Sequence, residues 1–281
     1  MMLLLQNGLN PARSTAFFNH VQAQLQSNGV AVDVVDQTDL ATQPLERYEL
    51  VVSNLVIPQP CRLRAPCYGA VQTDRSCGLR LLARCGLPVM PWALARTPHQ
   101  VRSLFDLWAA ERLLLKRSGS FGGTGVTAFT RAGLDQLTWD PDRDLFCPEL
   151  NPASGDVYKA EVFGGEVVMS FRSASPPLHA SMTGPVQHGV PGIYGTRTLL
   201  TFPEPLLTDL HRLASELHRL GAGHCSIDFM QDSRGDFQAI EINGGFVALW
   251  WTQQHDIFCH RMGGILERMV RECGRTARAA A

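Results

Sequence analysis

A chain of 281 residues with 45% hydrophobic residues and a formal net charge of −1 has the composition of a globular protein. The near-neutral charge gives no electrostatic footprint for nucleic acid, and no apolar run approaches the roughly 20 residues that span a bilayer. Residues 1–5 are apolar but lack the basic flank of a signal peptide, so we expect a buried first strand and a cytoplasmic location.

The first 90 residues have the alternating pattern of an α/β unit. Strands are indicated by short β-branched or apolar runs, and helices by apolar residues at helical spacing. We expect strands at 2–5, 30–35 and 50–57 and helices at 14–26 and 74–85. Alternation of this kind predicts a parallel sheet with helices on its faces.

Residues 91–150 are expected to form a second, smaller unit, with a helix at 98–110 and strands at 112–117 and 126–130. The two strands flank a glycine-rich loop at 118–125. In the P-loop and Rossmann motifs the glycine loop opens a helix, so this loop is of another kind. It either covers phosphates as a flexible flap through its backbone N–H groups or is simply a turn.

Lysine is used sparingly in this chain, and its positions favour the phosphate interpretation. Of the 25 basic residues only Lys116 and Lys159 are lysines. A compact ammonium on a flexible stem is a different phosphate ligand from a planar guanidinium. Lys116 immediately precedes the glycine-rich loop, where its charge would reach the same phosphates.

A third unit is expected over residues 151–275, before a short tail at 276–281. Its predicted elements are a hairpin over 157–172 that turns at Gly164-Gly165, a long loop over 173–198, and helices at 206–221 and 261–273. A strand at 145–150 leads into it. Loops as long as 173–198 in a compact domain are often functional.

The most informative stretch of this unit is the predicted hairpin 225–243, whose two strands alternate apolar and polar residues around a turn at 232–235. The alternation places Asp228 on the same sheet face as Glu241 and Asn243. Mg²⁺ prefers such oxygen ligands and leaves other positions to water and nucleotide phosphates. On these residues alone, a solvated acidic face is an equally good interpretation.

The ordered set of motifs resembles the ATP-grasp superfamily, most closely its RimK-type and glutathione-synthetase-like carboxylate–amine ligases. The set comprises Thr73-Asp74-Arg75, Gly86-Leu-Pro-Val-Met-Pro91, Lys116 with its glycine-rich loop, the segment 156–168, and Asp228 with 241–245. The resemblance covers residues 74–264. It implies a mixed α/β (α+β) ATP-grasp fold, with an N-terminal Rossmann-like pre-ATP-grasp domain, a small central α+β subdomain and a C-terminal antiparallel-sheet subdomain.

The resemblance also implies a site for ATP and Mg²⁺, with Mn²⁺ as a substitute metal. The implied metal ligands are Asp228, Glu241 and Asn243. The implied nucleotide contacts are Lys116 and Lys159 for the phosphates, Ser120, Gly122, Gly123 and Gly125 in the flap, and Glu149 and Leu150 at the adenine hinge. Pro148 makes that hinge atypical, because it removes one backbone donor.

The activity implied by the resemblance joins a small-molecule or peptide carboxylate to an amine through an acyl phosphate, with release of ADP and phosphate. Lys159 and Arg172 are the expected catalytic cations, although Arg172 could equally be an exposed charge at a strand end. His188 and Arg197 are weaker candidates on the substrate side. Trp250 and Trp251 would either wall a substrate pocket or pack in the core.

Two other functional classes stay open at this point. One is an ATP-grasp phosphotransferase that phosphorylates a hydroxyl, since it would use the same lysine and metal ligands. The other is a nucleotide-regulated binding module, against which the full set of Lys116, Asp228, Glu241 and Asn243 argues. The sequence leaves a homodimer open and does not identify the substrates.

Overall fold

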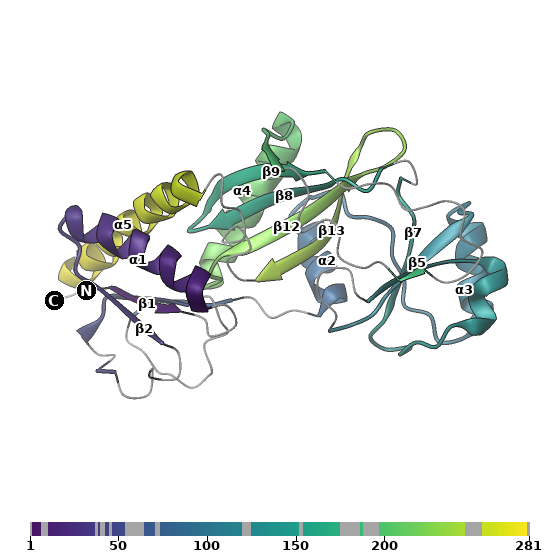
Figure 1. The fold of residues 1–281 in the computed structure, drawn as a ribbon, viewed down its shortest axis with the longest axis horizontal. Helices are drawn as coiled ribbons and strands as arrows, with labels where there is room; N and C mark the ends of the chain where they lie inside the picture. Colours follow the sequence, from purple (N-terminus) through teal and green to yellow (C-terminus); the bar gives the residue numbers. More distant parts are fainter. Residues whose placement is uncertain are drawn as a thin grey trace.

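The computed structural model describes residues 2–6, 11–36, 39, 43–44, 47–53, 65–70, 74–119, 125–151, 154–174, 186–187, 197–244 and 255–279. In this part of the chain three sheets follow one another along the long axis of the molecule (Figure 1). None of the helices within the described residues is long and apolar enough to cross a membrane.

The N-terminal sheet is parallel, as the alternating pattern predicts. Its strands are β1 (Met2–Gln6), β2 (Val32–Asp36), β3 (Leu50–Ser53) and β4 (Cys67–Tyr68), in the order β2-β1-β3-β4. Helix α1 (Pro11–Ser27) packs beside the C-terminal helix α5 (His255–Ala279), which is longer than the expected 261–273 (Figure 1). Phe17 and Phe18 of α1 share one buried cluster with Phe258 of α5, so the two chain ends form a common core.

The central sheet is antiparallel, in the order β10-β6-β5-β7. Its strands are β5 (Arg112–Lys116), β6 (Val126–Thr130), β7 (Leu145–Pro148) and β10 (Val186–Gln187), and it is accompanied by α3 (Pro98–Leu107) and the 3-10 helix η3 (Arg131–Gln136). Helix α3 begins with a capping box between Thr97 and Gln100. It ends before the expected residue 110, because Ala109 adopts a positive φ of 47°.

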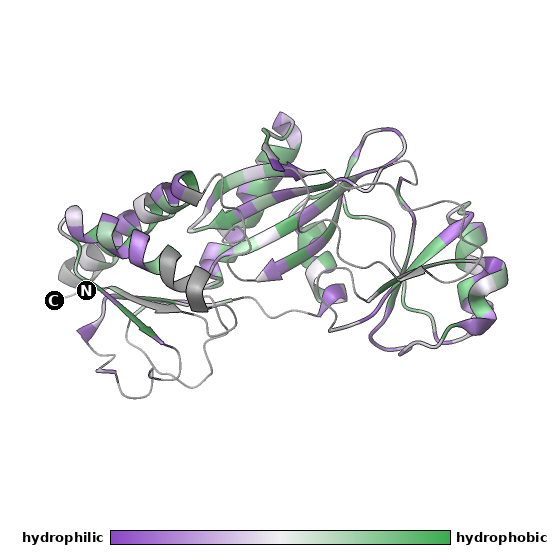
Figure 2. Ribbon diagram, viewed as in Figure 1, coloured by the Kyte–Doolittle hydropathy of each residue, from purple (hydrophilic) through white to green (hydrophobic). Residues whose placement is uncertain are grey.

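The third sheet is also antiparallel, with the order β11-β9-β8-β12-β13. Its strands are β8 (Val157–Phe163), β9 (Glu166–Ser173), β11 (Arg197–Leu199), β12 (Cys225–Gln231) and β13 (Phe237–Gly244). Figure 2 shows hydrophobic and hydrophilic residues interspersed along β12 and β13. Helix α4 (Glu204–Arg219) buries Leu210, Leu213 and Leu217 in the same cluster as Ile227 and Phe229, so this face of the sheet is core. The opposite face carries polar groups beside Met169 and Phe171, which belong to the buried cluster shared with α1 and α5.

The prediction of one long loop over 173–198 is wrong at two places, where the chain forms short strands. β10 pairs antiparallel with β6 of the central sheet, and β11 pairs antiparallel with β9. These strands have two and three residues, too few for a period of two to be visible in the sequence. The connection between Ser173 and Arg197 therefore contributes to both sheets.

The central and C-terminal sheets are joined by the extended segment that follows α2 (Arg75–Arg84). The N–H of Met90 donates to the carbonyl of Ala239 at 3.1 Å, and that of Ala239 donates to the carbonyl of Pro88 at 2.7 Å, along the edge of β13. Three residues later Ala93 exchanges hydrogen bonds of 2.9 Å with Phe146 of β7. This segment holds the polar face of the C-terminal sheet next to the end of the central sheet.

Asp74 is the N-cap of α2, and its contribution to stability can be measured. Its Oδ1 accepts hydrogen bonds from the N–H of Cys77 at 2.8 Å and the hydroxyl of Ser76 at 2.7 Å, and these bonds lower the pKa of Asp74 from 3.8 to about 2. A depressed folded-state pKa means that the stabilisation is complete above pH ~4 and lost as the pH falls towards 2. We expect Asp74→Ala to lower the free energy of unfolding by about 1 kcal/mol at neutral pH and by less near pH 2 in urea titrations. Equal stability at neutral pH would contradict this.

Candidate nucleotide and metal site

The polar face of the C-terminal sheet gathers side chains from three neighbouring strands. Asp228 of β12 lies opposite Glu241 of β13 on one side and Lys159 of β8 on the other, and Ser226 lies opposite Asn243. Partners across antiparallel strands project from the same face. A bulge follows directly after Asp228, a feature common next to active sites. The three oxygen-bearing residues expected to bind metal therefore share one face, and their role as ligands stays a prediction.

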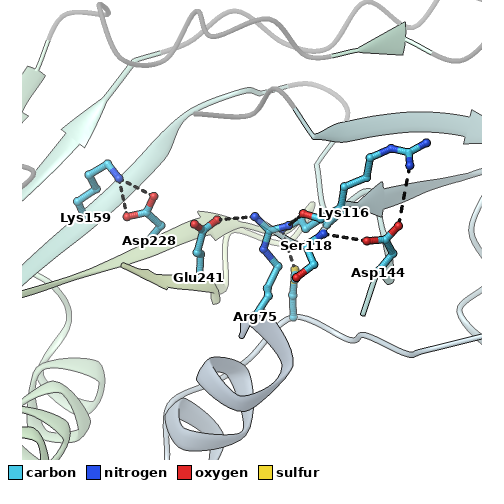
Figure 3. A network of polar contacts seen from close by, with 9 residues as sticks. Arg75, Lys116, Ser118, Asp144, Lys159, Asp228 and Glu241 are labelled. Carbon is cyan, nitrogen blue, oxygen red and sulfur yellow. Dashed lines mark hydrogen bonds and ion pairs between the residues drawn. The ribbon is translucent and has the colours of Figure 1, made fainter. Parts of the chain in front are cut away.

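Each of the two carboxylates is held by a basic side chain (Figure 3). The ammonium of Lys159 lies 2.5 Å from both carboxylate oxygens of Asp228, and Nη2 of Arg75 lies 3.5 Å from Oε2 of Glu241. Burial raises the pKa of Asp228, with the charge of Glu241 adding to that effect and Lys159 opposing it. Two carboxylates kept this close favour a cation between them.

The donor set on this face fits Mg²⁺. Within the described residues no three side chains of His, Cys, Asp or Glu are grouped to hold a metal ion. Two carboxylates and the amide of Asn243 are instead hard oxygen donors, which would hold Mg²⁺ in a site completed by water and phosphates. The same chemistry disfavours zinc, which prefers nitrogen and sulfur ligands.

Lys116 is the predicted phosphate ligand of the site. It is the last residue of β5, and the residue is only 6% exposed. Its ammonium contacts Sδ of Met90 at 3.4 Å, and a thioether is a weak acceptor. Because an ammonium has three donors, Lys116 can bind phosphate oxygens without breaking a strong contact.

The base of the glycine-rich loop is fixed by the carboxylate of Asp144, a residue that the sequence analysis missed. The N–H of Arg117 donates to the carbonyl of Gly125 at 2.8 Å and closes the base. The N–H of Ser118 donates to one oxygen of the buried Asp144 at 2.8 Å (Figure 3). The N–H of Asp140 donates to the other oxygen at 2.9 Å. The remaining flap candidates lie outside the described residues: Ser120, Gly122 and Gly123.

The predicted adenine hinge lies at the end of β7. The carboxylate of Glu149 accepts a hydrogen bond from Nη2 of Arg112 at 2.7 Å, while burial raises its pKa against the opposing charge of Arg112. Leu150 packs at the margin of the core shared with α4. The side chain of Glu149 is therefore occupied by an ion pair, and contact of this hinge with adenine stays a prediction.

The structure does not bring Arg172 together with the other predicted catalytic residues. Arg172 lies opposite Tyr158 and Thr198, on the face of the sheet away from Lys159, and its half-exposed side chain pairs with Asp156. The reason is a bulge between Glu161 and Val162, which shifts the register so that Phe171, not Arg172, is the cross-strand partner of Lys159.

Arg197 of β11 lies on the polar face instead. It is opposite Ser173, which is two residues from Phe171 and so projects to the same side as Lys159. Its guanidinium lies 5.5 Å from the centroid of the Phe171 ring. Burial lowers the pKa of Arg197, while the charge of Glu161 opposes that shift. The other substrate-side candidates, His188, Trp250 and Trp251, lie outside the described residues.

Arg75 is a further residue to which the sequence analysis gave no role in the site. Besides its contact with Glu241, its Nη1 donates to the backbone carbonyl of Arg117 at 3.0 Å (Figure 3). It thus connects the predicted metal ligand to the base of the flap. Its position directly after the helix cap Asp74 was the available signal, since the first turn of a helix attracts anions.

Comparison with solved structures identifies the fold. No protein-family model and no curated protein matches the chain. The macrocyclase MdnC of Microcystis aeruginosa, bound to its precursor peptide MdnA, matches with a TM-score of 0.65 at 14% identity over 95% of this chain and 99% of MdnC. The ATP-grasp ligase PsnB, with a precursor peptide and AMPPNP, matches with a TM-score of 0.64 at 11% identity over 96% and 98%.

D-cycloserine synthetase DcsG matches with a TM-score of 0.63 at 13% identity over 94% of this chain and 98% of DcsG. Identities this low establish the fold alone. Because the match to the ATP-grasp ligase PsnB extends over almost the whole of both chains, this chain has the ATP-grasp fold, and the fold expected from the sequence is confirmed.

Proposed function

We propose that this protein is an ATP- and Mg²⁺-dependent carboxylate–amine ligase that forms an amide or peptide bond through an acyl phosphate. The observation behind the proposal is the opposed pair Asp228 and Glu241 on a sheet face that also presents Lys159. The buried Lys116 at the start of the glycine-rich loop extends this group to the phosphates. The ligases that share the fold support the same reaction class.

In the proposed reaction an oxygen of the substrate carboxylate attacks the γ-phosphorus of ATP, and the bond to the β-phosphate oxygen breaks to give ADP and an acyl phosphate. An amine then attacks the acyl carbon, loses a proton and displaces phosphate. Mg²⁺ held by Asp228, Glu241 and Asn243 would neutralise phosphate charge. Lys116 would orient the phosphates, while Lys159 and Arg197 would stabilise the charge that develops on the transferring group.

The substrates are proposed by chemical class. Two of the similar ligases are bound to precursor peptides, and a third is a synthetase of the small molecule D-cycloserine. We therefore propose a peptide or small-molecule carboxylate as acyl donor and an amine as acceptor, with Mn²⁺ able to replace Mg²⁺. A cytoplasmic location accompanies this proposal.

The proposal is tested by incubating the protein with Mg-ATP and a panel of amino acids, small carboxylates and short peptides, with hydroxylamine as a surrogate amine. Hydroxamate formed in step with ADP is the expected result. ADP with a phosphorylated substrate and no hydroxamate would replace the ligase with a phosphotransferase. Nucleotide binding without any turnover across the panel would favour a nucleotide-regulated binding module.

The two arginines give a matched pair of variants. We expect Arg197→Gln to lower the rate of ADP release by about 100-fold, because it removes one stabilising charge from the polar face. Arg172→Gln should retain turnover within about threefold, because Arg172 lies on the other face of the sheet, where it pairs with Asp156. Steady-state ADP release on both variants checks this. The opposite ranking would restore Arg172 as the catalytic arginine.

A further inference from the structure

One peptide group at the base of the flap is bound through both its carbonyl and its N–H. It joins Arg117 to Ser118, directly after Lys116 at the end of β5. Its carbonyl accepts a hydrogen bond of 3.0 Å from Nη1 of Arg75, and its N–H donates to Oδ1 of Asp144 at 2.8 Å. Because both partners carry a charge, these are hydrogen bonds of the stronger kind, and together they fix the plane of the peptide group.

The two side chains that bind this peptide group come from different parts of the fold. Asp144 directly precedes β7 of the central sheet, is only 5% exposed, and accepts the N–H of Asp140 with its other oxygen at 2.9 Å. Arg75 is the first residue of α2, a helix that packs against β13 of the C-terminal sheet. The peptide group is therefore tied to both sheets at once.

Arg75 extends this connection to the predicted metal ligand. Its Nη2 lies 3.5 Å from Oε2 of Glu241, and Figure 3 shows its side chain projecting from the end of α2 between Glu241 and Ser118. The side chains of Arg75 and Glu241 are 11% and 27% exposed, so solvent screens this pair less than a surface pair. A planar guanidinium serves a carboxylate and a carbonyl together through separate N–H groups in one fixed geometry, which an ammonium does not.

We propose that Arg75 is a positioning residue that sets Lys116 of the central sheet against Glu241 of the C-terminal sheet, through the Arg117–Ser118 peptide group. Among the described strands none pairs β5 with β13, so strand pairing alone does not fix the separation of these two predicted ligands of Mg-ATP. A site whose parts are held in place before the substrate binds gains rate, because less orientation is lost in the reaction. The part of this inference that concerns ATP rests on the proposed function, whereas the conformational part does not.

The conformational part is tested on the whole protein without nucleotide, by hydrogen exchange of the Ser118 amide in nitrogen-15 NMR. We expect Arg75→Gln to speed this exchange about tenfold, although Arg75 binds the carbonyl of the peptide group and not its N–H. Arg80→Gln is the matched control, because Arg80 is an exposed residue of the same helix whose guanidinium lies over the ring of Trp92, and it should leave the exchange unchanged. Unchanged exchange in folded Arg75→Gln overturns the proposal.

The variant Glu241→Gln shows whether the connection reaches the predicted metal ligand. It should speed exchange of the Ser118 amide about threefold in the unmodified protein and have no effect in Arg75→Gln, because the two residues act in series. An equal effect in both backgrounds would mean that Glu241 acts without Arg75, and the proposal fails. A thermal melt verifies the fold of each variant. Should Arg75→Gln unfold, Arg75→Lys takes its place, since it keeps the charge without the planar fork, and exchange as slow as in the unmodified protein would then contradict the proposal.

Steady-state ADP release separates positioning from a direct contact of Arg75 with ATP. We expect Arg75→Gln and Asp144→Asn each to raise KM for ATP about tenfold, and the double variant to raise it little further, because both changes release the same peptide group. A hundredfold rise in the double variant would show two independent effects and would contradict positioning through this peptide group. If the unmodified protein shows no turnover with any substrate, the proposed function fails by itself, and exchange of the Ser118 amide still decides the conformational part.

Discussion

Glu241→Ala is expected to reduce ADP release by about 1000-fold or more at saturating Mg-ATP, with the fold intact. The change removes one of two opposed carboxylates and with it the proposed metal position, where a bound cation would contribute several kcal/mol. It also leaves Arg75 without its acidic partner, which adds uncompensated positive charge near the base of the flap. Steady-state ADP release over a range of Mg²⁺ concentrations gives the measurement.

The control for this variant is Glu216→Ala, because Glu216 of α4 pairs with Arg219 on an exposed helix surface. It should turn over at the rate of the unmodified protein. Circular dichroism checks the fold of both variants. Turnover of Glu241→Ala at the unmodified rate would remove the basis for a metal site on this face.

The second large effect is expected for Lys116. Lys116→Met fills the same buried volume with an uncharged chain, so the fold should be retained while kcat/KM for ATP falls about 100-fold or more. Lys116→Arg should rescue little of this loss, since a planar guanidinium does not replace a compact ammonium in a buried position beside Met90.

Measurements of nucleotide binding show whether Lys116 binds the phosphates or only stabilises the fold. Isothermal titration with ATP and with adenosine is expected to show weaker binding of ATP to Lys116→Met and unchanged binding of adenosine. Equal loss for both ligands would mean that Lys116 supports the fold rather than the phosphates. Full activity of Lys116→Arg would show that any cation suffices there.

The sequence was most informative where the period of a strand could be followed across a tight turn. The hairpin 225–243 is an example: its alternation assigned Asp228, Glu241 and Asn243 to one face, and the register agrees. The same reasoning around the turn at Gly164-Gly165 pairs Arg172 with Val157, on the face of Lys159. A bulge between Glu161 and Val162, which no residue pattern announces, shifts the register by one residue and puts Arg172 on the other face. Gly164 has a φ of +58°, and a side chain there would collide with Ile265, so glycine is required at that turn.

Contacts between distant segments could not be predicted in this way. Asp144 fixes the base of the flap from 26 residues away, and Arg75 reaches Glu241 from another element. Nothing in their local sequence marks these partners. Arg197 sits in a three-residue strand that looked like part of a loop. Its proposed role depends on the strand pairing that puts it on the same face as Lys159.

The most direct test of the account follows a labelled oxygen through the reaction. An acyl donor found in the hydroxylamine screen is prepared with oxygen-18 in its carboxylate and incubated with Mg-ATP and amine, and the released phosphate is analysed by mass spectrometry. Activation through an acyl phosphate predicts one labelled oxygen in each phosphate formed. Amide product with unlabelled phosphate would contradict carboxylate phosphorylation and with it the central claim.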